Sequence, residues 1–151
     1  MDNIPQRLDT ELKEALKARD ELKLSVVRML KASLKNKAIE KTGPLTDDEV
    51  ISVLSTMAKQ RRESIEQFAK AGRMELVEKE KKELEILHSY MPAQLSPQEI
   101  DEIIRAAITE TGASSAGDMG KVMKVVAPKT KGLADGKAVN QRVKELISPG
   151  S

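Results

Sequence analysis

The chemistry that this sequence offers most clearly is the binding of anions by a run of cations. Residues 119–144 hold seven basic residues and a single acid, so the stretch carries +6 in a chain whose net charge is only +2. At about 100° per residue, Lys121 and Lys124 fall opposite the apolar face of one expected helix. Lys137 and Lys144 fall opposite the apolar face of the next, and helix N-termini beside the connecting loop would add backbone donors for phosphate. We predict that six lysines form an anion-binding surface, with an ordinary solvated surface as the alternative: Lys121, Lys124, Lys129, Lys131, Lys137 and Lys144.

Residues that could act in catalysis are few. The chain has no cysteine, which excludes thiolate metal sites and cysteine nucleophiles, and His88 is its only histidine. Ser114-Ser115 would need a long glycine- and serine-rich scaffold to form a serine–serine–lysine amidase site, whereas here the pair simply precedes a helix. Gly120-Lys121 and Gly136-Lys137 lack the earlier glycine and the following Ser or Thr of a phosphate-binding loop. We therefore predict no catalytic residue, no metal site and no cofactor.

Two other charged stretches are more typical of solvated helix surfaces. Residues 28–41, in the helix expected to end near Lys41, hold five basic residues against one acid, Glu40. Residues 59–90 hold eight basic and seven acidic residues, many at helical i,i+4 spacing, where opposite charges stabilise an exposed helix. The basic residues of the first stretch are Arg28, Lys31, Lys35, Lys37 and Lys41.

A break in the middle of the chain divides the elements that must position these residues. Pro92 cannot continue a helix, because its ring removes an amide donor and clashes with the preceding turn. Four residues later Ser96 and Glu99 form a capping box, with Pro97 at the first helical position. We predict an N-terminal four-helix domain at residues 1–92, a C-terminal three-helix domain at 93–148 and a frayed terminus at 149–151.

Apolar residues spaced by three and four predict helices throughout, without a convincing period-two strand, so the fold class is all-α. The N-terminal helices are expected at about 6–19, 20–41, 46–70 and 74–90. Gly72 between the last two predicts a long antiparallel helical hairpin. The apolar stripe of the third helix breaks at Arg61, which indicates that its distal half projects or packs only loosely.

The C-terminal helices are expected to begin at Ser96, near Ser114 or Ser115, and at Asp135. The first should end at Gly112. The second should stop before Pro128, which leaves residues 129–136 as a basic loop.

Composition limits the partners. Aromatic residues make up 1% of the chain, so stacking on unpaired bases has almost no platform. The N-terminus lacks the basic and apolar regions of a signal peptide, and no run approaches the ~18 apolar residues of a membrane helix. We expect a cytoplasmic protein that does not enter a membrane.

Motifs along essentially the whole chain resemble those of the YqeY family. That family is similar to the C-terminal tail region of the B subunit of the tRNA-dependent (aspartyl/glutamyl-tRNA) amidotransferase. One departure is Leu133, which stands where an arginine is common. The motifs are Arg28-Met29-Leu30, Leu45-Thr46-Asp47-Asp48-Glu49-Val50, Lys59-Gln60-Arg61-Arg62-Glu63-Ser64-Ile65-Glu66-Gln67-Phe68, Ala71-Gly72-Arg73, Tyr90-Met91-Pro92-Ala93-Gln94-Leu95-Ser96, Thr111-Gly112-Ala113, Asp118-Met119-Gly120-Lys121-Val122-Met123 and Gly132-Leu133-Ala134-Asp135-Gly136-Lys137.

The resemblance implies a two-part all-α fold and, for function, a tRNA-contacting appendage. Family descriptions speak of a carbon–nitrogen ligase with glutamine as amido-N-donor, a label that belongs to the amidotransferase complex. The leading hypothesis is an accessory module that binds tRNA or another folded RNA, with an amidotransferase or a tRNA synthetase as candidate protein partners. The alternatives are a component of a carbon–nitrogen ligase or amidase activity, and a protein-interaction scaffold that uses the charged hairpin at 46–90.

Overall fold

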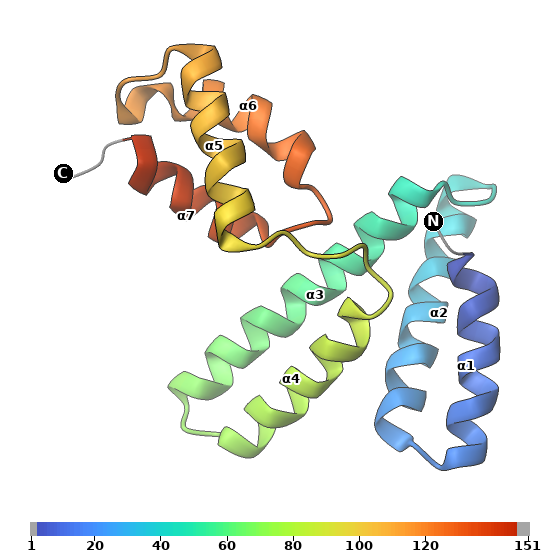
Figure 1. Cartoon of the computed structure of the whole chain (residues 1–151). Helices are drawn as coiled ribbons and strands as arrows, with labels where there is room; N and C mark the ends of the chain where they lie inside the picture. The colour runs from blue at the N-terminus through green and yellow to red at the C-terminus, as the bar shows by residue number, and fades with distance from the viewer. Residues whose placement is uncertain (1–2, 148–151) are drawn as a thin grey trace. The chain divides into compact units, whose positions relative to one another are not determined.

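The computed structural model describes residues 3–147, and every regular element in that range is a helix (Figure 1), which confirms the all-α fold class. The chain divides into two compact units, unit 1 (Met1–Met91) and unit 2 (Pro92–Ser151). The residues predicted to fray, 149–151, lie outside the described range. The elements are α1 (Ile4–Ala18), α2 (Glu21–Lys41), α3 (Asp47–Lys70), α4 (Met74–His88), α5 (Pro97–Thr111), a short 3-10 turn η1 (Ala116–Asp118), α6 (Met119–Thr130) and α7 (Gly136–Ile147).

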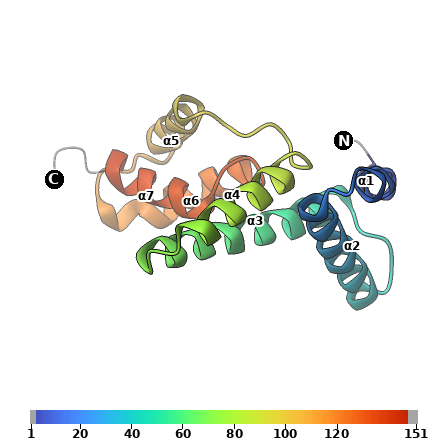
Figure 2. The ribbon, with the colours of Figure 1, turned by 90° about the horizontal axis from the view of Figure 1, so that it is seen from below.

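Unit 1 is built from two helix pairs, α1 with α2 and α3 with α4, and α2 packs against both α3 and α4. Figures 1 and 2 show α3 and α4 running side by side. Just beyond the end of α4, Tyr90 is buried, and the guanidinium of Arg7 from α1 lies 4.6 Å from the centre of its ring. The core of unit 1 consists of Ile4, Leu8, Val26, Val27, Leu30, Leu34, Val50, Leu54, Met57, Leu87 and Tyr90.

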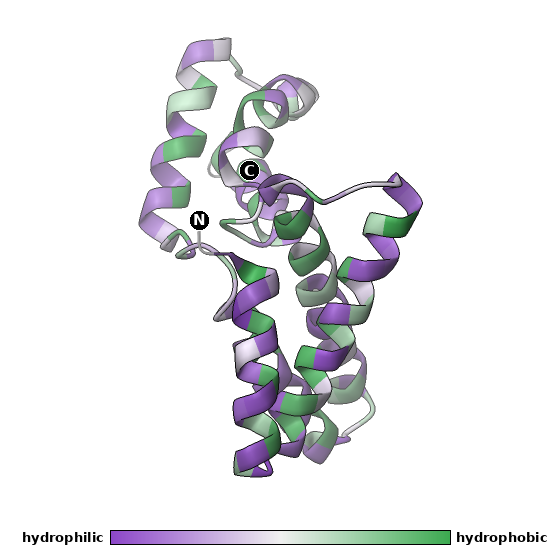
Figure 3. Ribbon diagram, turned by 90° about the vertical axis from the view of Figure 1, so that its right-hand side faces the viewer, coloured by the Kyte–Doolittle hydropathy of each residue, from purple (hydrophilic) through white to green (hydrophobic). Residues whose placement is uncertain are grey.

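Hydropathy follows the helical period. Figure 3 shows hydrophobic and hydrophilic residues in alternating bands along the helices, as expected when one face of each helix enters a core. The apolar residues of α1 are not all buried: Leu8 and Ala15 are buried, but Leu16 in the last turn is 50% exposed. Among the described helices, none combines the length and the apolar character that crossing a membrane requires.

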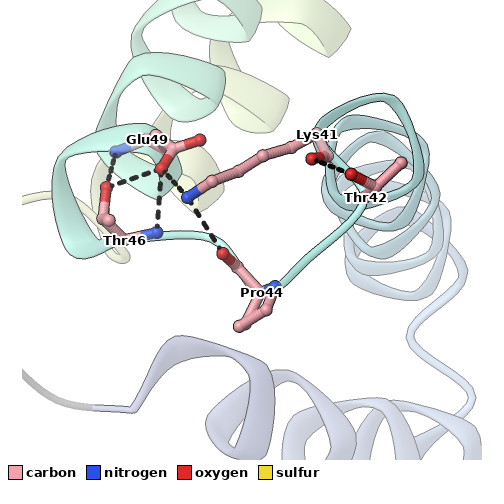
Figure 4. A network of polar contacts seen from close by, with 5 residues as sticks. All are labelled: Lys41, Thr42, Pro44, Thr46 and Glu49. Carbon is pink, nitrogen blue, oxygen red and sulfur yellow. Dashed lines mark hydrogen bonds and ion pairs between the residues drawn. The ribbon is translucent and has the colours of Figure 1, made fainter.

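The start of α3 is fixed by a capping box at Thr46 (Figure 4). The N–H of Glu49 donates to Thr46 Oγ1 (3.2 Å), and the N–H of Thr46 donates to Glu49 Oε1 (3.3 Å). Lys41 at the end of α2 forms an ion pair with Glu49 and donates to the carbonyl of Pro44 (3.1 Å). The bond from Lys41 lowers the pKa of Glu49. This network therefore ties the end of α2 to the beginning of α3.

We expect Thr46→Ala to lower the free energy of unfolding by about 1 kcal/mol, because an N-cap oxygen is lost and backbone donors of the first turn are left unpaired. Thr56→Ala is a matched control, since Thr56 is an exposed residue inside the same helix. That change should be neutral or slightly stabilising. Urea unfolding monitored by circular dichroism measures the unfolding free energy of both variants. Equal losses of stability in Thr46→Ala and Thr56→Ala would contradict the role given to the cap.

The turn between α3 and α4 confirms the predicted helical hairpin. Gly72 adopts φ +71°, a left-handed conformation that glycine tolerates without strain. The predicted loose packing of α3 beyond Arg61 is right only in part. No residue of α3 after Ala58 is buried, but Val77 on α4 is 2% exposed, and the Arg61 side chain is 11% exposed and paired with Glu80 and Glu83 of α4.

Unit 2 packs α5, α6 and α7 around a second core. The segment before α5 is held to the α6–α7 loop, because the N–H of Leu95 donates to Leu133 O (2.8 Å) and Gln94 Nε2 donates to Gly132 O (3.1 Å). Ser96 caps α5 as predicted, but the reciprocal bond of the box differs: Glu99 accepts from the Ser96 hydroxyl (3.2 Å). The core consists of Ile104, Ala107, Val122, Val126, Val139, Val143 and Ile147.

Helix α6 does not stop before Pro128, so that prediction is wrong, and Lys129 belongs to the helix rather than to the loop. Because Pro128 has no N–H, the helix loses one backbone hydrogen bond, the one to the carbonyl of Lys124. Lys124 is exposed. Beyond Pro128 the hydrogen bonds resume: the N–H of Lys131 donates to Ala127 O (3.0 Å), and the buried Thr130 donates its hydroxyl to Val126 O (3.1 Å). A proline in the last turn is therefore tolerated.

Candidate nucleic-acid interface

The six predicted lysines all lie in unit 2, and all six are exposed. We call the set the lysine surface. Helix α6 carries Lys121, Lys124 and Lys129, the following loop carries Lys131, and α7 carries Lys137 and Lys144. Both helices turn their valines toward the unit 2 core and pack against each other, which leaves the lysines on the outside. Whether the six form one continuous surface stays a prediction.

Most of the lysine surface has no internal counter-charge. Among residues 3–147, Lys124, Lys129, Lys131 and Lys144 have no carboxylate partner within ion-pair distance. Lys121 has only a long contact, from Nζ to Asp118 Oδ1 (3.8 Å), and its side chain is 70% exposed. Exposed contacts of this kind contribute little to stability. These positive charges therefore remain available to an outside anion.

Asp118 is held mainly by backbone donors. Its Oδ2 accepts from the N–H groups of Ser114 (3.0 Å) and Ser115 (3.3 Å), and these bonds hold the pKa of Asp118 below its usual value. The serine pair thus takes part in the turn that leads into η1 and α6. Lys121 shares a carboxylate that already has other partners.

Arg142 differs from the lysines, because its charge serves the fold. Its Nε and Nη2 donate to the two oxygens of Asp101 on α5 (2.7 and 2.8 Å), and Nη1 donates to Glu145 (2.8 Å). The bond from Arg142 lowers the pKa of Asp101. The sequence count of +6 missed this partner because Asp101 lies far along the chain. Including the flanking acids Asp118 and Glu145 reduces the charge of the stretch to +4.

Several cations elsewhere have carboxylate partners. On α2, Lys31 pairs with Asp9 (2.6 Å), and Lys41 pairs with Glu49. On the hairpin the ion pairs within 4 Å include Arg61–Glu83, Lys70–Glu66, Arg73–Glu75 and Lys81–Glu78. By contrast, the exposed Arg28, Lys35 and Lys37 of α2 have no carboxylate partner among the described residues. They provide a matched set against which the lysine surface can be compared.

The residues considered for catalysis, His88 and the Ser114-Ser115 pair, lie in different units. His88 ends α4 in unit 1; burial, and secondarily the positive charge of Arg62, lowers its pKa. Ser115 lies in unit 2, beside η1.

A groove of about 620 Å³ in unit 1 runs over Ile4 and Leu8 with Lys35 and Asp47 at its rim, and no serine, threonine or histidine lines it. Within residues 3–147, no group of His, Asp and Glu residues could hold a metal ion.

Comparison with known proteins finds relatives named "Altered inheritance of mitochondria protein 41, mitochondrial". The protein of Pyrenophora tritici-repentis is 34% identical over 149 residues, covering 93% of this chain and 79% of the relative. That of Lachancea thermotolerans is 38% identical, covering 72% and 59%. That of Eremothecium gossypii is 40% identical, covering 57% and 48%. The chain thus spans less than two thirds of the length of the last two relatives.

The names of these relatives contradict the predicted cytoplasmic location, which is wrong. That prediction depended only on missing features, a signal peptide and a membrane helix, and a mitochondrial protein needs neither. The family model described as Yqey-like protein matches residues 5–147, which is nearly the whole chain and both units. With this match and the 34% identity to a relative covered over most of its length, the chain belongs to the YqeY family.

Proposed function

We propose that the chain is an accessory module that binds the phosphate backbone of a folded RNA, with tRNA as the first candidate. The observation that carries the proposal is the set of four exposed lysines, Lys124, Lys129, Lys131 and Lys144, without a carboxylate partner in the described chain. Phosphate binding by lysine releases condensed counterions and dominates the affinity of proteins for nucleic acids. The resemblance to the tRNA-contacting tail of an amidotransferase subunit supports the same ligand.

The composition of the surface indicates how the RNA would be read. Phe68 and Tyr90, the only aromatic residues, both lie in unit 1, so the lysine surface has no ring for stacking on bases. Recognition would therefore depend on backbone position and RNA shape, with weak sequence preference. Titration of fluorescently labelled tRNA with the whole protein at 50 mM salt tests the proposal. We expect saturable binding, and the absence of binding at that salt concentration would refute it.

We further propose that the two units are separate folding domains. A fragment that begins at Pro92 should be helical and melt cooperatively, although ~60 residues is near the lower limit for independent folding. A fragment that begins at Ser96 should be less stable, because it loses the bonds from Gln94 and Leu95 to the α6–α7 loop. Circular dichroism during heating compares the two; equal melting temperatures would contradict the role of these bonds, and two unfolded fragments would contradict separate domains.

We expect no amidase activity from the isolated chain. The protein should release no ammonia from glutamine above the rate without enzyme, because the sequence shows no motif that pairs a nucleophile with a base. A coupled ammonia assay measures this, with His88→Ala and Ser115→Ala as companion variants. Release that either substitution abolishes would show that the chain is an enzyme.

A further inference from the structure

One side of α7 carries a pattern that the lysines alone do not explain. Val139, Val143 and Ile147 face the unit 2 core. Another side exposes two lysines with two amides between them, Lys137, Asn140, Gln141 and Lys144, which we call the α7 amide face. Together with Asp135 and Ala138, these residues line an open depression of about 490 Å³.

The spacing places the amides between two cations. Lys137 and Lys144 are seven residues apart, which is close to two turns and about 10.5 Å along the helix axis. They therefore lie on the same side of α7 but are too far apart to hold a single phosphate in common. Asn140 and Gln141 fall in the interval, where a ribose between two phosphates would lie.

The amides can do what the lysines cannot. An amide side chain both donates and accepts hydrogen bonds, whereas an ammonium group only donates. The ribose 2′-hydroxyl is likewise a donor and an acceptor, and it is the group by which proteins distinguish RNA from DNA. In an RNA duplex these hydroxyls are displayed in the wide, shallow minor groove, which an exposed helix face can approach.

Both amides are available for such contacts. The Asn140 side chain makes no hydrogen bond to another described residue. Gln141 makes one at the limit of distance, from Nε2 to Glu145 Oε1 (3.5 Å). The two acids beside the face already have partners: Glu145 accepts from Arg142, and Asp135 accepts from the N–H of Lys137.

We infer that the α7 amide face selects RNA over DNA, with Lys137 and Lys144 holding two phosphates and Asn140 and Gln141 bonding the 2′-hydroxyls between them. This inference rests on the proposed function and adds the chemical class of the duplex. It predicts different roles for neighbouring residues of one helix: the lysines set affinity, and the amides set the preference for RNA.

The test compares an RNA hairpin and a DNA hairpin of the same sequence, each titrated with the whole protein at one salt concentration. The wild type should bind RNA about fivefold to tenfold more tightly, the effect of one or two added hydrogen bonds. Asn140→Ala/Gln141→Ala should bring this ratio close to one through weaker RNA binding, with DNA binding unchanged. Lys137→Ala/Lys144→Ala should weaken both ligands by the same factor. Asn36→Ala/Gln60→Ala, a matched pair of exposed amides in unit 1, should change neither.

The outcomes separate the two claims. A wild type that binds neither hairpin refutes the proposed function and the inference with it. Equal binding of RNA and DNA by the wild type refutes only the inference. A preference that survives in the double amide variant also refutes it, and retained circular dichroism excludes unfolding as the cause of a lost preference.

Discussion

Replacing Lys124, Lys131 and Lys144 with glutamate will reduce tRNA affinity at least a hundredfold. The three residues sample α6, the loop and α7, and each exchange turns a phosphate partner into a group that repels phosphate. Stability should stay within about 0.5 kcal/mol of the wild type, because all three are exposed and none has a carboxylate partner in residues 3–147. Fluorescence anisotropy with labelled tRNA measures the affinity, and thermal melting measures the stability.

The matched control is the triple exchange of Arg28, Lys35 and Lys37 with glutamate on α2. It makes the same change in net charge at residues that are also exposed and without a carboxylate partner in the described range. Lys31 is a poorer choice, because its ion pair with Asp9 would be broken. We expect the tRNA affinity of this control variant to fall no more than about tenfold, because the lower net charge weakens the long-range attraction of tRNA. Loss of binding in the α2 variant, with binding retained in the lysine-surface variant, would place the site in unit 1.

Replacing Arg61 with methionine will destabilise unit 1 by about 3 kcal/mol. Arg61 Nε lies 2.9 Å from Glu83 Oε2 and 3.5 Å from Glu80 Oε2, and the three side chains are between 8% and 18% exposed. Neither Arg61 Nε nor Glu80 Oε2 makes a well-aligned hydrogen bond, so the attraction is mainly coulombic. Removal of the cation leaves two carboxylates together with little water to screen them. Urea unfolding at pH 7.5 measures the loss.

The effect should depend on pH in a defined direction. Burial, and secondarily the charge of Glu83, raises the pKa of Glu80. A carboxyl group whose pKa is higher in the folded state stabilises when protonated, so its contribution falls as the pH rises through that pKa. Without Arg61 the pKa of Glu80 should rise further. The loss of unfolding free energy in Arg61→Met, relative to the wild type, should therefore become smaller as the pH falls from 7.5 to 5.

A surface ion pair on the same hairpin serves as the control. Arg73 contacts Glu75 at 3.1 Å, but both side chains are more than half exposed. Arg73→Met should therefore change stability by less than about 0.5 kcal/mol at either pH. Equal losses in the Arg61 and Arg73 variants would show that the Arg61 cluster is no more than another solvated pair.

The helix ends were largely predictable because their signals act within one turn. Thr46 and Ser96 supply cap oxygens to donors three residues later, and Gly72 and Gly112 take the left-handed conformation that ends a helix. The exposure of the lysines was predictable in the same way. Buried valines at spacings of four define the inner side of α6 and α7, and the lysines fall outside it.

What sequence could not predict depends on partners far along the chain. In the sequence, Arg61 only interrupts an apolar stripe, and the packing of α3 on α4 is what brings Glu83 to it. Arg142 resembles one more cation of an anion site until α5 brings Asp101 beside it. Pro128 predicts a stop, but whether a helix tolerates one missing bond depends on what its last turn packs against. Local pattern contains none of this information.

The most direct test of the RNA-binding proposal is the salt dependence of tRNA binding by the wild-type protein. If the lysine surface neutralises four or five phosphates, log affinity should fall with log salt concentration at a slope of about −3 to −4. In the variant of Lys124, Lys131 and Lys144 the slope should shrink by about one for each phosphate that no longer has a lysine partner. A wild-type slope near zero would contradict the account even if tRNA were bound, because binding would then depend on interactions other than those between lysine and phosphate.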